Sequence, residues 1–234
     1  MENTLIKPTT SVNDKQRIDT TKYTFRIVRL NATELAQYPK LPQLTTIMNN
    51  AFSVTGRKYP GLYNAELKRY DAPTELVEDM GRDGVLFITL ATTSEQTDAD
   101  PRPIATTGYK PWIDTFDLGD KLKASFTVTE YPEQHKTPDD VPRFEIKAVT
   151  VDPEFQSQGL ASQLFANVTE EIFGGVRSRG GSRVRLMVCT FKEINEGYWT
   201  AKGFVKLTEM RFDVGTAGSL TGFSSMDMYR DHCL

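Results

Sequence analysis

The chain has 234 residues, of which 38% are apolar and 25% are charged, and its formal net charge is −3. This composition is that of an ordinary globular protein with enough apolar material for a core, which excludes wholesale disorder. A protein whose main task is to grip nucleic acid carries a basic excess, and this chain has an acidic one. We therefore expect no nucleic-acid partner.

The distribution of apolar residues and cysteines indicates a compartment. The longest apolar stretch, around Val85–Ile88, is far shorter than the ~20 residues of a membrane-spanning helix. Residues 1–14 have no apolar segment of the kind found in secretory signals. The two cysteines, Cys189 and Cys233, suit a reducing compartment better than a disulfide, and the two histidines lack partners at metal-ligand spacing. We expect a cytoplasmic protein, with the nucleus left open, that binds neither a membrane nor a metal.

Three segments differ in character along the chain. Residues 1–22 are polar and aperiodic, and we expect them to form a flexible N-terminal arm. Residues 23–234 contain neither an internal repeat nor a Pro-rich linker, which favours a single domain. Within it, residues 111–142 are polar, with seven acids against three lysines, and we expect a variable insertion. Two interpretations of this insertion stay open, a lid or binding loop and a solvated excursion.

Hydrophobic periodicity predicts seven strands and four helices. In the first half we expect a strand at Tyr23–Leu30, helices at 42–52 and 73–80, and a hairpin of Val85–Ala91 and Ile104–Lys110. In the second half we expect a strand at Arg143–Val151, a helix at Leu160–Phe173 that Gly174 and Gly175 end, and a strand at Arg183–Thr190. A short helix near Asn195 that Gly203 closes and strands at Phe204–Asp213 and Ser224–Tyr229 follow. Strands alternate with helices only in the second half. The predicted fold class is therefore α/β (α+β), with a mixed central sheet of about seven strands and flanking helices.

The stretch from Val149 to Ala161 is the most informative about function. A strand ends at Asp152-Pro153, a short loop follows, and a long helix begins near Gly159. The first turn of a helix leaves its N–H groups unpaired and carries the positive end of the dipole. Such a strand–loop–helix unit is a seat for a phosphate or pyrophosphate. The sequence lacks the Gly-Lys-Ser/Thr of a Walker loop and the first glycine of the dinucleotide fingerprint, which excludes both.

The run QSQGLA at residues 156–161 resembles the acetyl-CoA motif of the GNAT superfamily of N-acetyltransferases, Arg/Gln-x-x-Gly-x-Gly/Ala. Downstream, the run YWTAKGF at residues 198–204 occupies the place of the family's aromatic-x-x-x-Gly-Phe element. The resemblance is strong over residues 143–204, loose over 23–110 and absent from 111–142. It implies a GNAT fold, in which two parallel strands of the mixed sheet splay apart, and acetyl-CoA as the cosubstrate.

The resemblance also implies where the cofactor lies. Pantetheine would lie like an added strand beside Val149, Thr150 and Val151, with its amides bonded to the backbone of Val149 and Val151. The pyrophosphate would sit on the helix start, formed by Gln156, Ser157, Gln158, Gly159, Leu160, Ala161 and Ser162. Because this loop contains no Lys or Arg, backbone dipoles would hold the anion, and the affinity for CoA would depend only weakly on salt.

Further cofactor contacts are expected from two regions. Asn195 and Trp199 belong to the implied cofactor set, although Asn195 reads first as a helix N-cap and only second as a CoA contact. The four arginines at 177, 179, 183 and 185 have two interpretations, a solvated loop and a group that reaches the 3′-phosphate.

Glu145 is the expected general base. A lysine-like amine has a pKa of about 10.4 and is mostly protonated at neutral pH, so a carboxylate must accept its proton, directly or through water. Glu145 precedes Gln156 by 11 residues, the spacing at which it resembles the glutamate base of histone-type family members. Strand alternation places it on one face with Val149 and Val151. The alternative is a half-exposed strand glutamate that pairs with a lysine.

The general acid is less clearly indicated. In the family, a tyrosine four residues before the glycine of Gly-Phe often protonates the leaving thiolate, and here that position is Trp199. The adjacent Tyr198 lies roughly 100° round the helix and is our candidate for the acid, acting from a shifted helix. Water is the alternative donor.

These observations predict a CoA-dependent N-acetyltransferase that transfers acetyl to a primary amine by direct attack in a ternary complex. The acidic insertion favours a small-molecule amine, a polyamine or an amino acid as the acceptor. One alternative is a protein lysine or N-terminal acetyltransferase. Another, motivated by the tryptophan at the tyrosine position, is a non-catalytic acetyl-CoA sensor. Whether the chain forms a homodimer stays open.

Overall fold

The computed structural model describes residues 19–62, 66, 68–93, 100–113, 126–130, 140–216 and 219–234. Residues 1–18 of the expected arm and 114–125 and 131–139 of the expected insertion lie outside these described residues. The elements run in the order η1 Thr20–Lys22, β1 Tyr23–Asn31, α1 Ala32–Ala36, α2 Leu41–Lys58, α3 Pro73–Met80, β2 Val85–Thr93, β3 Arg102–Pro111, β4 Phe126–Glu130, β5 Arg143–Val151, η4 Pro153–Phe155, α4 Leu160–Ser178, β6 Arg183–Phe191, α5 Lys192–Ala201, β7 Val205–Phe212 and β8 Phe223–Cys233.

The described strands form one mixed sheet in the order β1-β2-β3-β5-β6-β8-β7-β4. All neighbours are antiparallel except β5 and β6, which are parallel. The mixed α/β class is confirmed, and all seven expected strands are present. The eighth, β4, lies in the insertion that the sequence pattern left without elements. It pairs with the outer edge of β7 through backbone hydrogen bonds. The run FTVTE does alternate apolar and polar residues, but it is short and stands alone in a polar segment.

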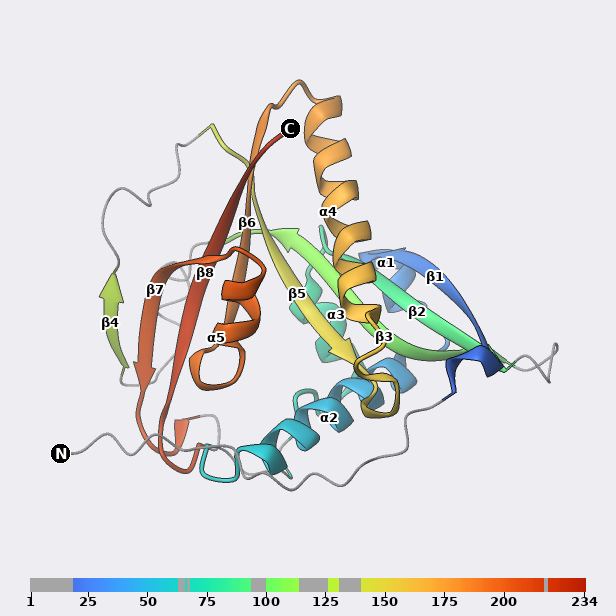
Figure 1. Cartoon of the computed structure of the whole chain (residues 1–234), viewed down its shortest axis with the longest axis horizontal. Helices are drawn as coiled ribbons and strands as arrows, with labels where there is room; N and C mark the ends of the chain where they lie inside the picture. The colour runs from blue at the N-terminus through green and yellow to red at the C-terminus, as the bar shows by residue number, and fades with distance from the viewer. Residues whose placement is uncertain are drawn as a thin grey trace.

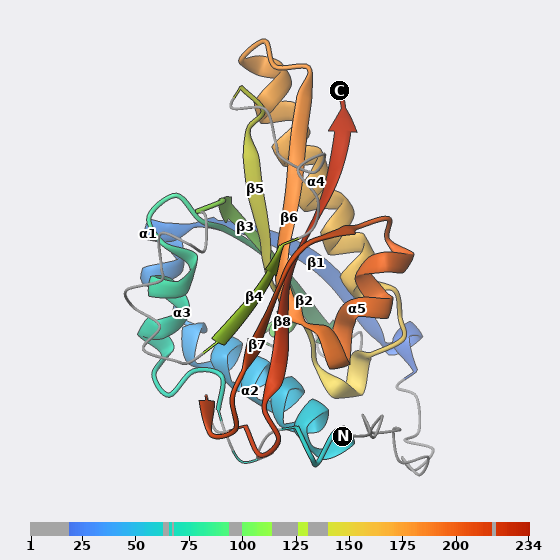
Figure 2. The same cartoon turned by 90° about the vertical axis from the view of Figure 1, so that its left-hand side faces the viewer.

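Helices cover both faces of the sheet (Figure 2). Helices α1, α2 and α3 pack on one face around Leu44, Leu76 and Ile88, while α4 and α5 pack on the other. The buried residues of α4 recur every four positions, at Leu160, Leu164, Val168, Ile172 and Val176, as one apolar stripe requires.

Helix α4 continues past the two glycines that were expected to end it. It runs through Gly174 and Gly175 to Ser178, because Val176 extends the buried stripe by one more turn. The stop lies at Gly180, which has φ +80°, a conformation that favours glycine. Among the described residues no helix has both the length and the apolar composition to cross a membrane.

Strands β5 and β6 separate soon after they pair. Their register covers only Arg143–Glu145 against Arg185–Met187, and beyond this point the two strands diverge (Figure 1). The splayed parallel pair that the resemblance implied is therefore present. The gap between the strands lies beside α5, whose residues Asn195, Tyr198 and Trp199 share one cleft with both strands.

A β-bulge in β5 changes which face its side chains occupy. Ala148 has φ +52°, and the pairing of β5 with β3 shifts between Thr106 and Gly108. A bulge adds one residue and so interrupts the alternation of faces. As a result Ala148 packs in the core beneath α2 and α3, whereas Val149 and Val151 pack on the α4 side with Ile146. The expectation that Glu145 shares a face with Val149 and Val151 is wrong for this reason.

Candidate active site

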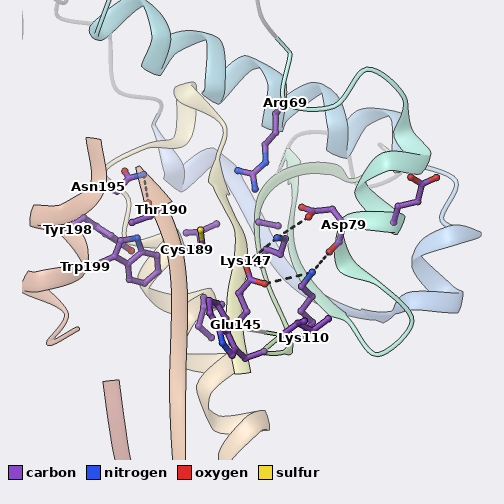
Figure 3. Close-up of a pocket in the computed structure, with 16 residues that line it drawn as sticks. Arg69, Asp79, Lys110, Glu145, Lys147, Cys189, Thr190, Asn195, Tyr198 and Trp199 are labelled. Atoms are coloured by element: carbon purple, nitrogen blue, oxygen red, sulfur yellow. Dashed lines mark hydrogen bonds and ion pairs between the residues drawn. The ribbon is translucent and has the colours of Figure 1, made fainter. Parts of the chain in front are cut away.

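A cleft of about 480 Å³ opens where β5 and β6 part (Figure 3). It brings together five residues of the expected site: Glu145, Val149, Asn195, Tyr198 and Trp199. The other lining residues come mainly from the α3 side and from the two diverging strands: Arg69, Glu78, Asp79, Lys110, Trp112, Ile113, Ile146, Lys147, Ala148, Cys189 and Thr190. The residues from Gln156 to Ser162 lie at the start of α4, outside this lining.

Among the described residues the backbone of β5 is open toward the gap at Val149, and at Val151 it meets the Gln156 side chain, whose Nε2 donates to the Val151 carbonyl at 3.4 Å. On the opposite side, the Ala148 carbonyl accepts a bond from Thr106 Oγ1 at 2.6 Å, and the Asp152 N–H donates to the Ile104 carbonyl at 2.7 Å. Because backbone groups alternate in direction along a strand, those of Val149 and Val151 face away from β3 and into the gap. Thr150, which lies between them, is buried and pairs with Thr106 of β3. This edge can accept an extended amide-bearing ligand.

The beginning of α4 has the geometry of an anion seat. Ser157 and Gly159 have φ values of +63° and +79°, so the loop turns sharply just before the helix. The first bond at the helix start runs from the Gln163 N–H to the Gly159 carbonyl, at 3.0 Å. The N–H groups of Leu160, Ala161 and Ser162 are therefore left for another partner. Together with the helix dipole they favour a bound phosphate or pyrophosphate.

Sequence reasoning missed a cation at this seat. The Nζ atom of Lys202, at the end of α5, lies 3.4 Å from the Oγ atom of Ser162 in the first turn of α4. Lys202 stands directly before Gly203-Phe204, in the run YWTAKGF. Nothing in that run indicates that the end of α5 meets a helix start 40 residues earlier. The expectation of an anion seat without a cation is therefore wrong.

The arginines at 177–185 do not reach this seat. Arg185 is buried, forms a bidentate ion pair with Asp231 at 2.7 and 2.8 Å, and lies 3.9 Å from the centre of the Tyr229 ring. Arg177 bonds Glu170 at 3.0 Å near the C-terminal end of α4. Since an α-helix rises about 1.5 Å per residue, the 19-residue α4 holds this end roughly 28 Å from its start.

Glu145 lies in the cleft, as a general base would, and it also pairs with two lysines, as a structural strand glutamate would. Only 8% of the residue is exposed. Its carboxylate lies 3.2 Å from the Lys147 ammonium and 3.8 Å from that of Lys110. Figure 3 shows the three side chains converging from β5 and β3. The carboxylate thus sits at the point where the parallel strands separate.

A second carboxylate stabilises the same cations. Asp79 of α3 lies 2.9 Å from the Lys147 ammonium and accepts a bond from the Tyr70 hydroxyl at 2.8 Å. Burial opposes the charge of Asp79, but the charge and hydrogen bond of Lys147 outweigh it and lower the pKa of the carboxyl. Burial likewise opposes the charge of Lys147, yet Glu145 and Asp79 raise the pKa of its ammonium. These groups therefore stay ionised at neutral pH.

Comparison with solved structures identifies the architecture. Arabidopsis thaliana NAA60, in complex with a bisubstrate analogue, aligns over 89% of this chain and 98% of its own, with 13% identity and a TM-score of 0.54. An agmatine N-acetyltransferase mutant in its apo form aligns over 89% and 99%, with 12% identity and a TM-score of 0.51. The chain has the GNAT fold. No protein-family model and no curated protein match it.

Within this GNAT fold, helix α5 brings both of its aromatic residues to the cleft lining. Trp199 is 5% exposed and packs edge-on against Phe204, with ring centres 5.1 Å apart. Tyr198 is 40% exposed and faces the cleft. Burial of the phenol disfavours its ionised form and raises the pKa of Tyr198, so the hydroxyl keeps its proton at neutral pH.

The N-cap interpretation of Asn195 is wrong. Helix α5 begins at Lys192 with Phe191 as its N-cap, so Asn195 lies one turn inside the helix. Its amide donates to Thr190 Oγ1 at 2.9 Å, and both side chains line the GNAT cleft (Figure 3). Asn195 is therefore fixed in orientation at the wall formed by β6 and α5.

Cys189 also lies in this cleft, on the part of β6 that faces the gap. Its side chain is exposed to the cleft, but the surrounding protein removes bulk water from the sulfur. This desolvation, assisted by the charge of Asp227, raises the pKa of the Cys189 thiol to about 12. The thiol is therefore protonated at neutral pH and a poor nucleophile. Among the described residues, no group of three or more His, Cys, Asp and Glu side chains is placed to hold a metal ion.

Proposed function

We propose that this protein is a CoA-dependent N-acetyltransferase that acetylates a primary amine. The observation that carries the proposal is the separation of β5 from β6 directly after Glu145. That separation opens a strand edge beside a helix start that favours anions, and it leaves a carboxylate at the inner end of the gap. A pantetheine-linked diphosphate can then bind along the open strand edge and the helix start. An amine can be held next to it, beside the carboxylate.

The chain's own groups fit acetyl-CoA. The backbone of Val149 and Val151 would bond the pantetheine amides, and the N–H groups at the start of α4 would bind the pyrophosphate with Lys202 beside them. Asn195 and Thr190 would line the path of the ligand between these two binding regions. When bound, acetyl-CoA supplies an activated acyl thioester.

Three residues have distinct roles in the proposal. Glu145 accepts the proton of the amine, directly or through one water, and the two lysines hold its carboxylate in place. Tyr198 keeps its hydroxyl proton and is the donor available to the leaving thiolate. Cys189 remains a thiol, which favours direct attack of the amine over a route through the enzyme. Holding both reactants in one cleft supplies a large part of the rate.

The proposed acceptor is a small-molecule amine, polyamine or amino acid, in a cytoplasmic protein with no nucleic-acid or membrane partner. One solved structure with this fold is named as an agmatine N-acetyltransferase, a name that gives a small amine as acceptor. A protein lysine or N-terminus is the second candidate. A sensor without activity is the third, because the tryptophan at the family's tyrosine position packs in the core.

Thiol release and calorimetry together test the proposal. The purified chain is incubated with acetyl-CoA and a panel of small amines, polyamines, amino acids and peptides, and free thiol is recorded. CoA binding is measured separately by calorimetry. An acetyltransferase binds CoA and releases thiol with at least one amine. A sensor binds CoA and releases none, and a protein that does not bind CoA contradicts both.

A further inference from the structure

Arg69 lies in a segment that helix α2 holds in place. The Asn49 side-chain carbonyl accepts hydrogen bonds from the N–H groups of Arg69 and Tyr70, at 2.9 and 3.0 Å. The amide of the same side chain donates to the Tyr70 carbonyl at 2.8 Å. Three bonds from one side chain fix the backbone at this point. The fold therefore determines the direction in which the Arg69 side chain leaves it.

The guanidinium of Arg69 lines the cleft and is hydrogen-bonded through its Nε atom. Its Nε atom donates to the Tyr70 hydroxyl at 3.2 Å, and that hydroxyl donates to Asp79 at 2.8 Å. Figure 3 shows the guanidinium pointing from the α2 side toward Lys147 and Glu145. Within the described parts of the chain no hydrogen bond or salt bridge engages the two Nη groups, which are therefore available for a planar partner. This pair of donors matches the two oxygens of a carboxylate.

Three cations of the cleft lining, Arg69, Lys110 and Lys147, share two buried or half-buried carboxylates, Asp79 and Glu145, and both carboxylates also act on the charge of Arg69. Lys147 pairs with Asp79 and Glu145, and Lys110 pairs with Glu145. Arg69 takes part in none of the salt bridges formed within the described parts of the chain. The remaining carboxylate of the lining, Glu78, is exposed to solvent, where water and salt screen its charge.

We propose that Arg69 binds a carboxylate of the acceptor, so that the acceptor is an amine that also carries a carboxylate, such as a free amino acid. This inference rests on the proposed acetyl transfer. A guanidinium–carboxylate pair supplies both charge and orientation, and directs the amine of the same molecule toward Glu145. A polyamine would instead bring a second cation to Arg69, and like charges repel.

Matched pairs of amines test this inference. Each of the common L-amino acids is compared with its carboxamide, which keeps the amine and side chain but loses the negative charge. The amine of a carboxamide is the less basic of the two, so chemistry alone favours the carboxamide. We expect the wild-type protein to prefer the acid, with a KM about 10- to 100-fold lower for the best pair.

Two variants and a control isolate the role of Arg69. In Arg69→Met, the KM for the acid should rise to that for the carboxamide, with a much smaller change in kcat. In Arg69→Lys, which keeps the charge without the fork, an intermediate KM is expected. Arg57→Met is the control, because Arg57 of α2 bonds Ser53 at 2.7 Å and does not line the cleft. This control should retain the wild-type preference.

The failure of this inference differs from the failure of the proposed function. If carboxamides or decarboxylated amines are acetylated as well as the acids, or if Arg69→Met keeps the preference, the inference is wrong while acetyl transfer stands. If no amine in either arm releases thiol, acetyl transfer is wrong. Thermal shift with N-acetyl amino acids then decides on Arg69 alone. If N-acetyl amino acids raise the melting temperature of the wild-type protein but not that of Arg69→Met, the result supports a carboxylate site. If they do not raise it, or raise it equally in both proteins, the result excludes the site.

Discussion

The Nζ atom of Lys202 lies 3.4 Å from the Oγ atom of Ser162, which brings a cation from the end of α5 to the start of α4. The ammonium also lies about equally far from two aromatic rings, 5.2 Å from the centre of Phe165 and 5.1 Å from that of Tyr198. These contacts hold Lys202 beside the N–H groups of the helix start. A phosphate at this seat would therefore meet both the helix dipole and the charge of Lys202.

Replacing Lys202 by methionine should weaken CoA binding mainly at low salt. An exposed charge contributes about 0.2–1 kcal/mol, so the Kd should rise by roughly two- to fivefold at low ionic strength. The difference from wild type should shrink as salt screens the charge. Calorimetry at two ionic strengths measures this. Arg177→Met at the far end of α4 is the control, and an equal effect of both substitutions would contradict a specific role for Lys202.

A negative side chain at Gly159 should abolish CoA binding. Gly159 has φ +79°, and a Cβ there would meet no atom within 4 Å. Gly159→Glu therefore places a carboxylate at the helix start, at a backbone strain of about 1–3 kcal/mol. Gly180 is the matched control, because it has φ +80° and equally open surroundings at the other end of α4. Gly180→Glu should lower the melting temperature similarly and leave the Kd for CoA unchanged.

Gly159→Ala separates strain from charge at the same position. Alanine meets the same unfavourable φ without a carboxylate, so it should lose only a small part of the affinity for CoA. Thermal unfolding and calorimetry of the three variants give both quantities. Equal affinity of Gly159→Glu and wild type would remove the start of α4 from the cofactor site.

The sequence predicted the parts of the site that depend on local pattern. The helix start at Gly159 and the strand that carries Glu145 follow from periodicity and short-range signals, and both are present. The bulge at Ala148 could not be predicted, because alanine carries no signal for a positive φ. The approach of Lys202 to Ser162 and of Arg69 to the cleft depends on which distant segments the sheet brings together. Such contacts have no local sequence pattern.

Cys189 should react slowly with alkylating reagents and should be dispensable for turnover. With a pKa of about 12, its thiolate fraction at pH 8 is roughly three orders of magnitude below that of a free cysteine. Since the pKa is raised, the thiolate forms only as pH approaches that value. The rate of modification by iodoacetamide should therefore keep rising up to about pH 10. Peptide mapping by mass spectrometry distinguishes Cys189 from Cys233.

Two further measurements bear on Cys189. Alkylation in denaturant should proceed at the ordinary rate, because unfolding restores water to the sulfur. Cys189→Ala should keep the turnover of the wild-type protein, because the amine attacks without help from this thiol. A rate of modification that levels off below about pH 9 would show an ordinary or activated thiol, and a large loss of turnover in the alanine variant would assign Cys189 a role.

Replacing Glu145 by glutamine should lower turnover at neutral pH. The substitution keeps the shape of the side chain and removes the proton acceptor, and general-base contributions are typically 10²–10⁴-fold. We expect kcat to fall by at least about tenfold. CoA binding should hardly change, because the expected cofactor contacts on β5 are backbone groups. The best acceptor from the amine panel is needed for this measurement.

The dependence on pH distinguishes a base from a structural carboxylate. Raising the pH should partly rescue Glu145→Gln, because more of the amine then arrives already neutral.

Asp79→Asn is the control, since it removes the other carboxylate that pairs with Lys147 but not the proposed acceptor of the proton. The pKa of Asp79 is lowered in the folded protein, so its stabilising effect is present above the unfolded pKa and is lost as pH falls through the folded value. Asp79→Asn should therefore reduce stability at neutral pH without introducing rescue at high pH. Wild-type turnover of Glu145→Gln from about pH 6 to about pH 9 would show that Glu145 serves only to balance Lys110 and Lys147.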